Sequence, residues 1–213
     1  MQTLRETFES VESERLAQIY RAAAELFCEK GFDGTSMSAV AEAVGVTKAA
    51  IYHFVPGGKA ELLFAVMSYG MDRLEDYVIT PARGIVDAET RLRTIIRNHV
   101  RIITSGASPN GHNPVTIVVE EVGGLSKEHR RTVDKRKRVY VDLIRDTLIQ
   151  LNAENKLRPV DETVAAFSML GTILWVARWY EPNGRLTAEQ INDEISKLIL
   201  GSLLRPQARL GKR

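Results

Sequence analysis

The sequence of 213 residues is poor in cysteine and has no long apolar run. Its one cysteine, Cys28, cannot form a disulfide within the chain, which is typical of proteins in a reducing cytosol. No stretch of about 18 apolar residues is present, so we expect no membrane-spanning helix. Residues 1–15 contain acidic side chains and lack an apolar core, so we expect no signal peptide. Together these absences predict a cytoplasmic protein.

Catalytic and metal-binding patterns are also missing. The 4 histidines are scattered, and neither an H-E-x-x-H zinc motif nor a G-x-S-x-G nucleophile motif occurs. The segment PGGKAE lacks the leading glycine and the Ser/Thr of a phosphate-binding loop. We therefore expect no catalytic residues, no metal and no cofactor. The net charge is only +2, so any affinity for nucleic acid must come from a local basic surface.

Helical periodicity, by contrast, runs through most of the sequence. Apolar residues recur every three or four positions, and alternating strand patterns are nearly absent. We therefore predict an all-α fold of about nine helices, with short helices near the N-terminus and longer ones in the larger C-terminal part. The predicted helices span residues of about 12–30, 37–43, 47–54, 59–77, 92–103, 115–122, 126–155, 161–180 and 187–203.

The strongest local signal lies between Ser36 and Phe54. Ser36 and Thr47 are favourable N-cap residues for two short helices, and Gly45 between them accepts the positive φ angle of a tight turn. Two short helices joined in this way are typical of a helix-turn-helix, whose second helix enters the major groove of DNA. Two core helices joined by a glycine turn would give the same apolar pattern, so that alternative stays open at this point.

The outward residues of the second short helix have the chemistry of a DNA-reading surface. Its N-terminal amide groups suit a phosphate oxygen. Lys48 suits a guanine or a phosphate, and the small Ala49 permits close approach to a thymine methyl group. Tyr52 and His53 add polar groups for a phosphate or a base edge. Lys, Tyr and His presented together favour double-stranded DNA as the partner over simple core packing.

Residues 21–54, RAAAELFCEKGFDGTSMSAVAEAVGVTKAAIYHF, resemble the N-terminal domain of the TetR family of transcriptional regulators. An apolar helix, G-F-x-G-T-S, A-x-x-x-G-V-[ST] and Y-H-F before a lysine occur in the order that the family shows. The one departure is VPGG before Lys59, where the family has a shorter segment. The resemblance implies phosphate contacts from Ser36, Thr47, Tyr52 and Lys59, and major-groove contacts from Lys48, Ala49 and His53.

The resemblance also implies two domains and a homodimer. The DNA-binding domain would span residues 1–58, the effector-binding and dimerisation domain residues 59–205, and a loose basic tail residues 206–213. In the family, the last two helices pair two protomers, and residues 164–176 are apolar on nearly all sides, which exceeds what one protomer's core needs. We expect recognition helices about 34 Å apart on a palindromic operator.

The C-terminal half resembles a subgroup of TetR regulators that respond to acyl-CoA thioesters in fatty-acid, steroid and aromatic-acid breakdown. The segments that carry this resemblance are EVGGLSKEHRRTVDKRKRVY, LRPVD and GTILWVARWYEPNGRLTAEQI. An acyl-CoA effector needs an apolar cavity and cations for its phosphates. The candidate cations are Arg97, Arg101, Arg138 and Arg178. The candidate lining residues are Ile103, Met169, Ile173 and Trp175, with His99 on the same apolar helix face as Ile103.

Other interpretations of these residues stay open. The lining candidates would also suit a plain core or a dimer interface, and His99 would also suit a hydrogen-bonded place in the core. The basic residues 135–138 would suit a solvated helix face. The predicted function is a ligand-responsive repressor that a small molecule releases from its operator, although activation would fit the same residues. The alternatives are a ligand-independent DNA binder, which the long C-terminal part disfavours, and a protein-interaction module.

Overall fold

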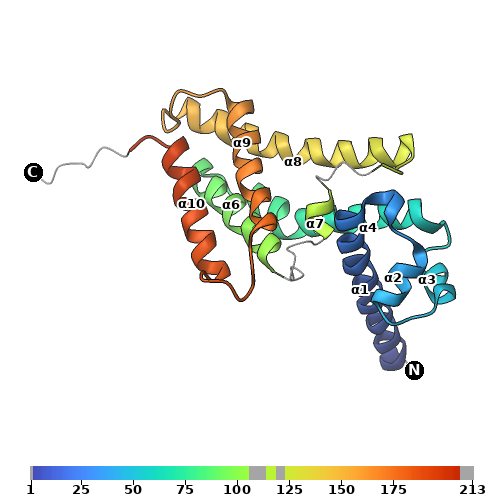
Figure 1. Ribbon diagram of the computed structural model, residues 1–213. Helices are drawn as coiled ribbons and strands as arrows, with labels where there is room; N and C mark the ends of the chain where they lie inside the picture. Colours follow the sequence, from blue (N-terminus) through green and yellow to red (C-terminus); the bar gives the residue numbers. More distant parts are fainter. Residues whose placement is uncertain (1, 106–113, 119–122, 207–213) are drawn as a thin grey trace, which may run out of the picture. The chain divides into compact units, whose positions relative to one another are not determined.

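The computed structural model describes residues 2–105, 114–118 and 123–206, which Figure 1 shows as a ribbon. Over these residues the chain forms helices and turns, with one isolated antiparallel bridge between Leu157 and Leu204. The predicted all-α fold is therefore confirmed. Of the 10 α-helical segments, α4 (Gly58–Leu74) and α5 (Thr80–Arg83) are joined by a π turn, η1 (Glu75–Ile79), into one continuous helix. Counted in this way, the described helices correspond to the nine predicted.

The chain forms two compact units, residues 1–73 with 112–135, and residues 74–111 with 136–213. The first holds α1 (Gln2–Gly34), α2 (Met37–Ala43), α3 (Lys48–Phe54), most of α4 (Gly58–Leu74), α7 (Pro114–Ile117) and the start of α8 (Lys127–Ala153). The second holds the π turn η1 (Glu75–Ile79), α5 (Thr80–Arg83), α6 (Ala88–Thr104), the rest of α8, α9 (Glu162–Trp175), the 3-10 turn η2 (Val176–Arg178) and α10 (Ala188–Leu203). The functional boundary predicted at residue 58 stays a prediction, because these units are defined by packing alone.

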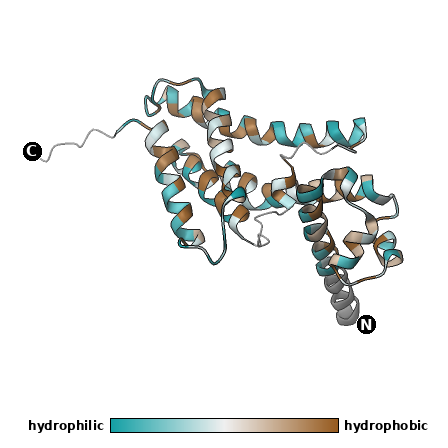
Figure 2. Cartoon of the chain, viewed as in Figure 1, coloured by the Kyte–Doolittle hydropathy of each residue, from teal (hydrophilic) through white to brown (hydrophobic). Residues whose placement is uncertain are grey.

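Each unit is built around its own apolar core. The largest fully buried side chains of the first unit are Ile19, Phe27, Ile51, Leu62, Leu63, Met71 and Ile117. Those of the second are Ile79, Leu92, Ile95, Ile96 and Ile103. Figure 2 shows that the N-terminal end of α8 is hydrophilic, whereas α9 is more apolar. In the second unit, α6 packs against both α9 and α10 and supplies the buried Leu92, Ile95, Ile96 and Ile103 to the core.

The predicted helix caps are present in the structure. The Ser126 hydroxyl oxygen accepts a hydrogen bond of 3.0 Å from a backbone N–H at the start of α8. The Asp161 carboxylate accepts two such bonds of 2.9 Å at the start of α9. Thr187 and Gln190 form a reciprocal capping box at the start of α10. Each cap satisfies backbone donors that a helix start leaves unpaired, which is why these starts were predictable from local sequence.

Several helix boundaries differ from the prediction. Helix α1 begins at Gln2 rather than near residue 12. The sequence did not indicate this earlier start, because the residues before position 12 lack regular apolar spacing. The helix predicted to end at residue 77 continues through η1, where the Thr80 N–H donates to the Glu75 carbonyl, five residues back. A π turn of this kind accommodates Pro81, and the helix ends only at Gly84. Helix α9 ends at Trp175 and tightens into η2.

Some predictions fall partly beyond the described residues. The short helix predicted over residues 115–122 is present as α7, which the structure assigns to Pro114–Ile117. Residues 119–122 of that prediction lie outside the described residues, as do residues 207–213 of the predicted basic tail.

Candidate nucleic-acid interface and effector site

The helix-turn-helix is formed by α2, the turn at Gly45 and α3. Gly45 has a φ angle of 68°, the left-handed region that was predicted for it. The turn is closed by a hydrogen bond of 2.9 Å from the Val46 N–H to the Ala41 carbonyl. Val40 on α2 and Ile51 on α3 are fully buried. Their burial fixes α3 on its inner face and leaves its opposite face to solvent.

The outer face of α3 carries the predicted DNA-binding residues. Lys48, Ala49 and His53 are exposed, and the Tyr52 side chain is 40% exposed although it is aromatic. Tyr52 follows Lys48 by four residues, and His53 follows Ala49 by four residues. The two members of each pair therefore lie on the same helix face. The structure thus brings these four residues together on a surface that a DNA groove could reach.

Ser36 and Thr47 are the N-caps of the two short helices, as predicted. Each hydroxyl oxygen accepts a hydrogen bond from a backbone N–H, at 3.1 Å for Ser36 and 3.2 Å for Thr47. Both residues are exposed. Because the oxygen is used as an acceptor, the hydroxyl proton remains available to donate to a phosphate oxygen. The two cap residues can therefore hold their helices and contact a DNA backbone at the same time.

Lys59 has a contact within the protein that the sequence did not indicate. Its Nζ donates a hydrogen bond of 2.8 Å to the Phe32 carbonyl and lies 4.3 Å from the centre of the Phe32 ring. Hydrogen bonding and the cation–π contact hold the lysine at the end of α1. The ammonium group retains two other donors, so a phosphate contact by Lys59 stays a prediction.

In the second unit, His99 of α6 and Tyr140 of α8 form a buried polar pair. The Tyr140 hydroxyl lies 2.9 Å from His99 Nδ1, and both side chains are buried. Burial lowers the pKa of His99 from 6.5 to about 3, so the imidazole is neutral at pH 7. Burial also raises the pKa of Tyr140, so its hydroxyl stays protonated.

The second nitrogen of His99 has no partner in this pair. Its Nε2 is buried and has no hydrogen-bond partner among the residues that the structure describes. If Tyr140 donates to Nδ1, the proton of the neutral ring sits on Nε2, and one buried donor is left unpaired. The opposite tautomer leaves both Nε2 and the tyrosine proton unpaired, which costs more. The structure therefore favours a buried N–H donor at Nε2 that lacks an acceptor.

The predicted lining residues separate into two groups. Ile103, Met169 and Ile173 are buried, and they belong to α6 and α9, which pack against each other. Trp175 is 65% exposed, so it stands apart from the buried candidates, and its predicted role in an effector lining stays a prediction. A tryptophan in an apolar helix can face a core or a partner, and the sequence pattern does not distinguish the two.

The four predicted cations also fall into two groups, because only two of them line the same pocket. Arg97 and Arg101 line one pocket of about 330 Å³ beside the start of α10, together with Asn192. Asn192 was not predicted, although a polar residue among the apolar positions of α10 could have indicated it. Its side chain donates a hydrogen bond of 2.8 Å to the Arg97 carbonyl. Arg138 and Arg178 are exposed and do not line that pocket.

The pKa of His99 gives a prediction for stability against pH. The folded pKa lies below the unfolded value, so the stabilisation is present above pH 6.5 and is lost as the pH falls toward 3. With one proton involved, about 2 kcal/mol of unfolding free energy should be lost between pH 6.5 and about pH 5. Urea unfolding at both pH values checks this for the wild type and for His99→Asn. The variant should lose less stability than the wild type, and equal losses would contradict the assignment.

Two families of known proteins match the sequence. The tetR family of bacterial regulatory proteins matches residues 19–66, which include α2, the turn and α3. The tetracyclin repressor-like C-terminal domain matches residues 86–203, more than half of the chain. The chain belongs to the TetR family. Membership confirms the predicted family and agrees with the prediction of a transcriptional regulator rather than an enzyme.

Several TetR relatives are similar over nearly their whole length. The crystal structure of AibR in complex with isovaleryl coenzyme A and operator DNA is 40% identical, with a TM-score of 0.74, and the match covers 86% of this chain and 97% of AibR. A TetR/AcrR-family regulator from Thermobifida fusca is 33% identical, with a TM-score of 0.61, over 88% of this chain and 97% of its own. The transcriptional repressor KstR2 of Mycobacterium tuberculosis is 24% identical over 194 residues, 89% of this chain and 92% of KstR2.

Two further features are properties of the described residues alone. Among them, no helix is both long and apolar enough to span a membrane. Within the same residues, no group of three or more His, Cys, Asp or Glu side chains is placed to hold a metal ion.

Proposed function

We propose that this protein is a transcriptional repressor that binds a palindromic operator as a homodimer and leaves it when an acyl-CoA thioester binds. The similarity to AibR, whose structure contains both isovaleryl coenzyme A and operator DNA, supports both parts of the proposal. Lys48, Ala49 and His53 would read the major groove, and Ser36, Thr47, Tyr52 and Lys59 would contact phosphates. Because it binds chromosomal DNA, the repressor would act in the cytoplasm.

The unpaired Nε2 of His99 is the observation that carries the effector part of this proposal. A buried N–H donor without an acceptor costs about 1–3 kcal/mol, and a ligand carbonyl would remove that cost. The thioester carbonyl of an acyl-CoA is such an acceptor, and Ile103, Met169 and Ile173 supply the apolar surroundings that an acyl chain needs. Arg97 and Arg101 would meet the phosphates of the coenzyme.

Release from DNA would follow from a shift between two conformations. The ligand-free dimer would place its recognition helices at the spacing of successive major grooves. If the acyl-CoA binds the other conformation more tightly, it depopulates the spacing that matches the operator. An effector that binds both conformations equally would leave operator affinity unchanged.

A thermal-shift experiment tests the effector class. Isovaleryl-CoA at about 100 times its Kd should stabilise the protein by about 2.7 kcal/mol and raise Tm by about 5–10 °C. Longer and aromatic acyl-CoA thioesters belong in the same series, with free CoA as the control without a thioester carbonyl. If no CoA thioester raises Tm, the effector class is wrong, although the proposed DNA binding is unaffected.

Two substitutions of His99 separate the thioester contact from simple packing. An asparagine amide reaches about as far as Nδ1 and can keep the Tyr140 contact, but it does not reach the position of Nε2. A glutamine amide reaches the position of Nε2. His99→Asn should therefore weaken acyl-CoA binding by about tenfold, which is the loss of one hydrogen bond, and His99→Gln should weaken it less. Equal affinities for wild type and His99→Asn would contradict the assigned role of Nε2.

A further inference from the structure

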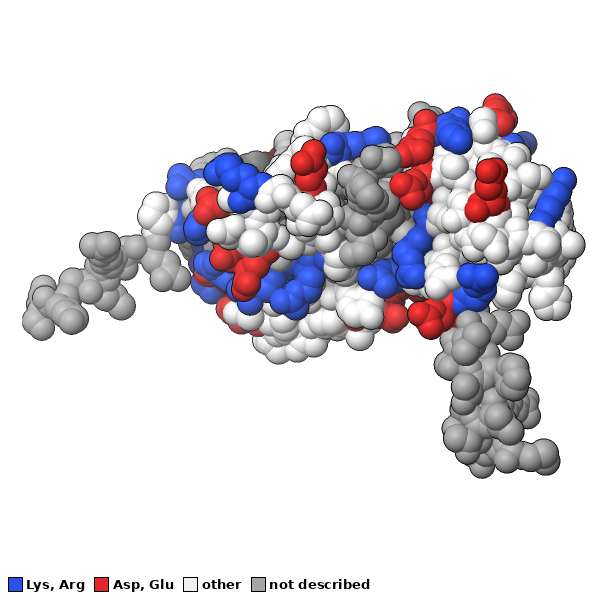
Figure 3. Space-filling model, turned by 60° about the horizontal axis from the view of Figure 1, so that its bottom comes forward, with Lys and Arg blue, Asp and Glu red and all other residues white. Residues whose placement is uncertain are grey.

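A second pocket of the C-terminal unit lies where the start of α6 meets the end of α10. It has a volume of about 520 Å³, and its lining includes four cations and one carboxylate: Arg93, Lys156, Arg158, Arg205 and Glu89. None of these residues belongs to the pocket of Arg97 and Arg101. Figure 3 shows that Lys and Arg side chains, with Asp and Glu among them, are spread over the surface of the molecule. The pocket is therefore separate from the proposed effector residues and has a positive charge excess.

Two of these cations are held in fixed positions by the backbone. The isolated bridge joins Leu157 to Leu204, and Arg158 and Arg205 follow these residues directly. Arg158 Nε donates to the Leu204 carbonyl at 3.0 Å, and Arg205 Nε donates to the Leu157 carbonyl at 2.8 Å. Each arginine thus uses Nε to hold the other segment and keeps its two terminal Nη groups. Among the described residues, neither guanidinium has a carboxylate partner.

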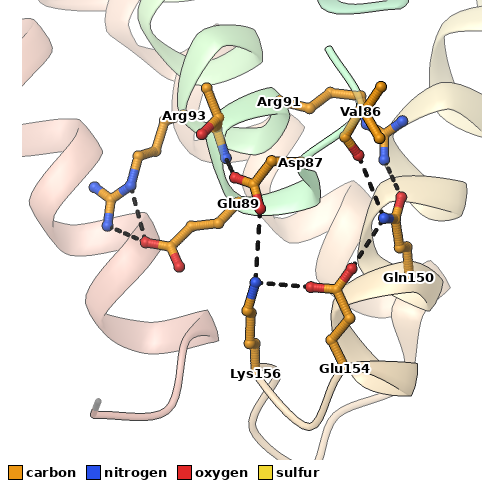
Figure 4. Close-up of polar contacts among 9 residues, drawn as sticks. Val86, Asp87, Glu89, Arg91, Arg93, Gln150, Glu154 and Lys156 are labelled. Carbon is orange, nitrogen blue, oxygen red and sulfur yellow. Dashed lines mark hydrogen bonds and ion pairs between the residues drawn. The ribbon is translucent and has the colours of Figure 1, made fainter. Parts of the chain in front are cut away.

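The other two cations are partly neutralised by nearby carboxylates. Arg93 binds Glu89 through both Nε and Nη2, at 3.1 and 2.6 Å. Lys156 forms ion pairs with Glu154 at 2.8 Å and with Asp87 at 3.6 Å. Figure 4 shows these pairs around the start of α6, with Lys156 between the two carboxylates. The unbalanced charge of the pocket therefore belongs mainly to Arg158 and Arg205.

Surface arginines are often simply solvated, but two features distinguish this pair. An arginine that is free in solvent has many rotamers, whereas these two have lost part of that freedom through their Nε hydrogen bonds. Fixed guanidinium groups bind oxyanions with two parallel hydrogen bonds each. Two such groups without carboxylate partners fit a ligand that carries at least two negative charges and several acceptor oxygens.

We propose that this pocket binds the diphosphate group of a small molecule, as a site separate from the acyl-CoA effector site. Arg158 and Arg205 bind the two phosphoryl groups through their Nη atoms, and Arg93 and Lys156 add positive charge at the rim. Free pyrophosphate and a nucleoside diphosphate present the same chemistry. A monocarboxylate has too little charge to balance the pocket.

Isothermal titration calorimetry on the full-length protein tests this site and separates the two sources. Pyrophosphate and ADP should both bind with Kd values below about 1 mM, and adenosine should not bind. ADP that binds more tightly than pyrophosphate identifies a nucleotide site, and equal affinities identify a pyrophosphate site. If neither anion binds at about 1 mM, the proposal is wrong.

Variants of the pocket residues change the affinity in opposite directions. The double variant R158Q/R205Q should weaken pyrophosphate binding by about tenfold or more, whereas R145Q/R185Q removes the same charge elsewhere on this unit and should leave it unchanged. Glu89→Gln removes the carboxylate that lines the pocket and should strengthen binding, which a folding defect could not produce. Weakening by the control to the same extent, or no strengthening by Glu89→Gln, would overturn the proposal.

Competition decides whether the site is separate. Isovaleryl-CoA at saturation should leave pyrophosphate affinity unchanged, and R158Q/R205Q should keep its acyl-CoA response. Displacement of pyrophosphate by isovaleryl-CoA would assign the pocket to the CoA nucleotide and overturn the separate site. If the protein responds to no acyl-CoA but binds pyrophosphate, the proposed effector class is wrong and the proposed diphosphate site is supported.

Discussion

Replacing Lys48 and Tyr52 together with alanine is expected to lower operator affinity by at least about a hundredfold. Both side chains lie on the outer face of α3 and are exposed. A base contact contributes about 1–3 kcal/mol, and a two-fold dimer loses each contact twice. Alanine is a good helix former, so K48A/Y52A should keep the fold of α3. Fluorescence anisotropy with labelled operator DNA measures the loss, and circular dichroism confirms that the helices remain.

Lys127→Ala is the matched control for this experiment. Lys127 is an exposed lysine in the first turn of α8, in the same compact unit as α3 but outside the helix-turn-helix. Its removal lowers the net charge by the same amount as Lys48→Ala and should change operator affinity only slightly. If K48A/Y52A binds the operator as the wild type does, α3 is not the recognition helix. That result would favour a protein-interaction module.

Trp175→Glu is expected to convert the dimer into monomers and thereby abolish operator binding. One face of α9 carries exposed apolar side chains, among them Phe167 at 58% and Trp175 at 65%, and Leu198 on α10 is 65% exposed. Gly171 between the two α9 aromatics would allow close approach of a partner helix. Large aromatic residues contribute strongly to interfaces. A glutamate at this position would bury one unpaired charge per protomer in the interface.

Light scattering coupled to size-exclusion chromatography measures this change. The wild type should elute as a dimer and Trp175→Glu as a monomer at micromolar concentration. Ile149→Glu is the matched control, since Ile149 is an exposed apolar residue of α8 in the same unit, away from α9 and α10 in the sequence. Its substitution should leave the dimer intact. A dimeric Trp175→Glu would show that the exposed face of α9 is not the interface.

Local sequence signals predicted the helix-turn-helix well. The N-caps Ser36 and Thr47 act on backbone groups only three residues away, and the positive φ angle of Gly45 is a property of glycine itself. Such features depend on neighbouring residues and are therefore visible in a single sequence. The end of α4 was less predictable, because the π turn before Pro81 arises from hydrogen-bond geometry that leaves no periodic pattern.

Contacts between distant residues could not be predicted from the pattern. His99 and Tyr140 are 41 residues apart in the sequence, and each alone looks like a core residue. Arg158 and Arg205 are adjacent only because the segments that carry them form a bridge. Trp175 is a different case. Its apolar surroundings in the sequence indicated that the side chain is covered, but not whether the protomer's own core or a partner subunit covers it. The candidate DNA-binding face was thus largely predictable, and the effector site was not.

The most direct test of the account measures operator affinity with and without an effector. Labelled duplexes from the protein's own promoter region would be titrated by fluorescence anisotropy, with a scrambled duplex as the control. We predict specific binding with a Kd of about 10 nM or tighter, and at least about tenfold weaker binding when isovaleryl-CoA or another acyl-CoA is added. Equal affinity for the specific and scrambled duplexes would contradict sequence-specific DNA binding, and an operator affinity that no acyl-CoA changes would contradict an acyl-CoA-responsive repressor.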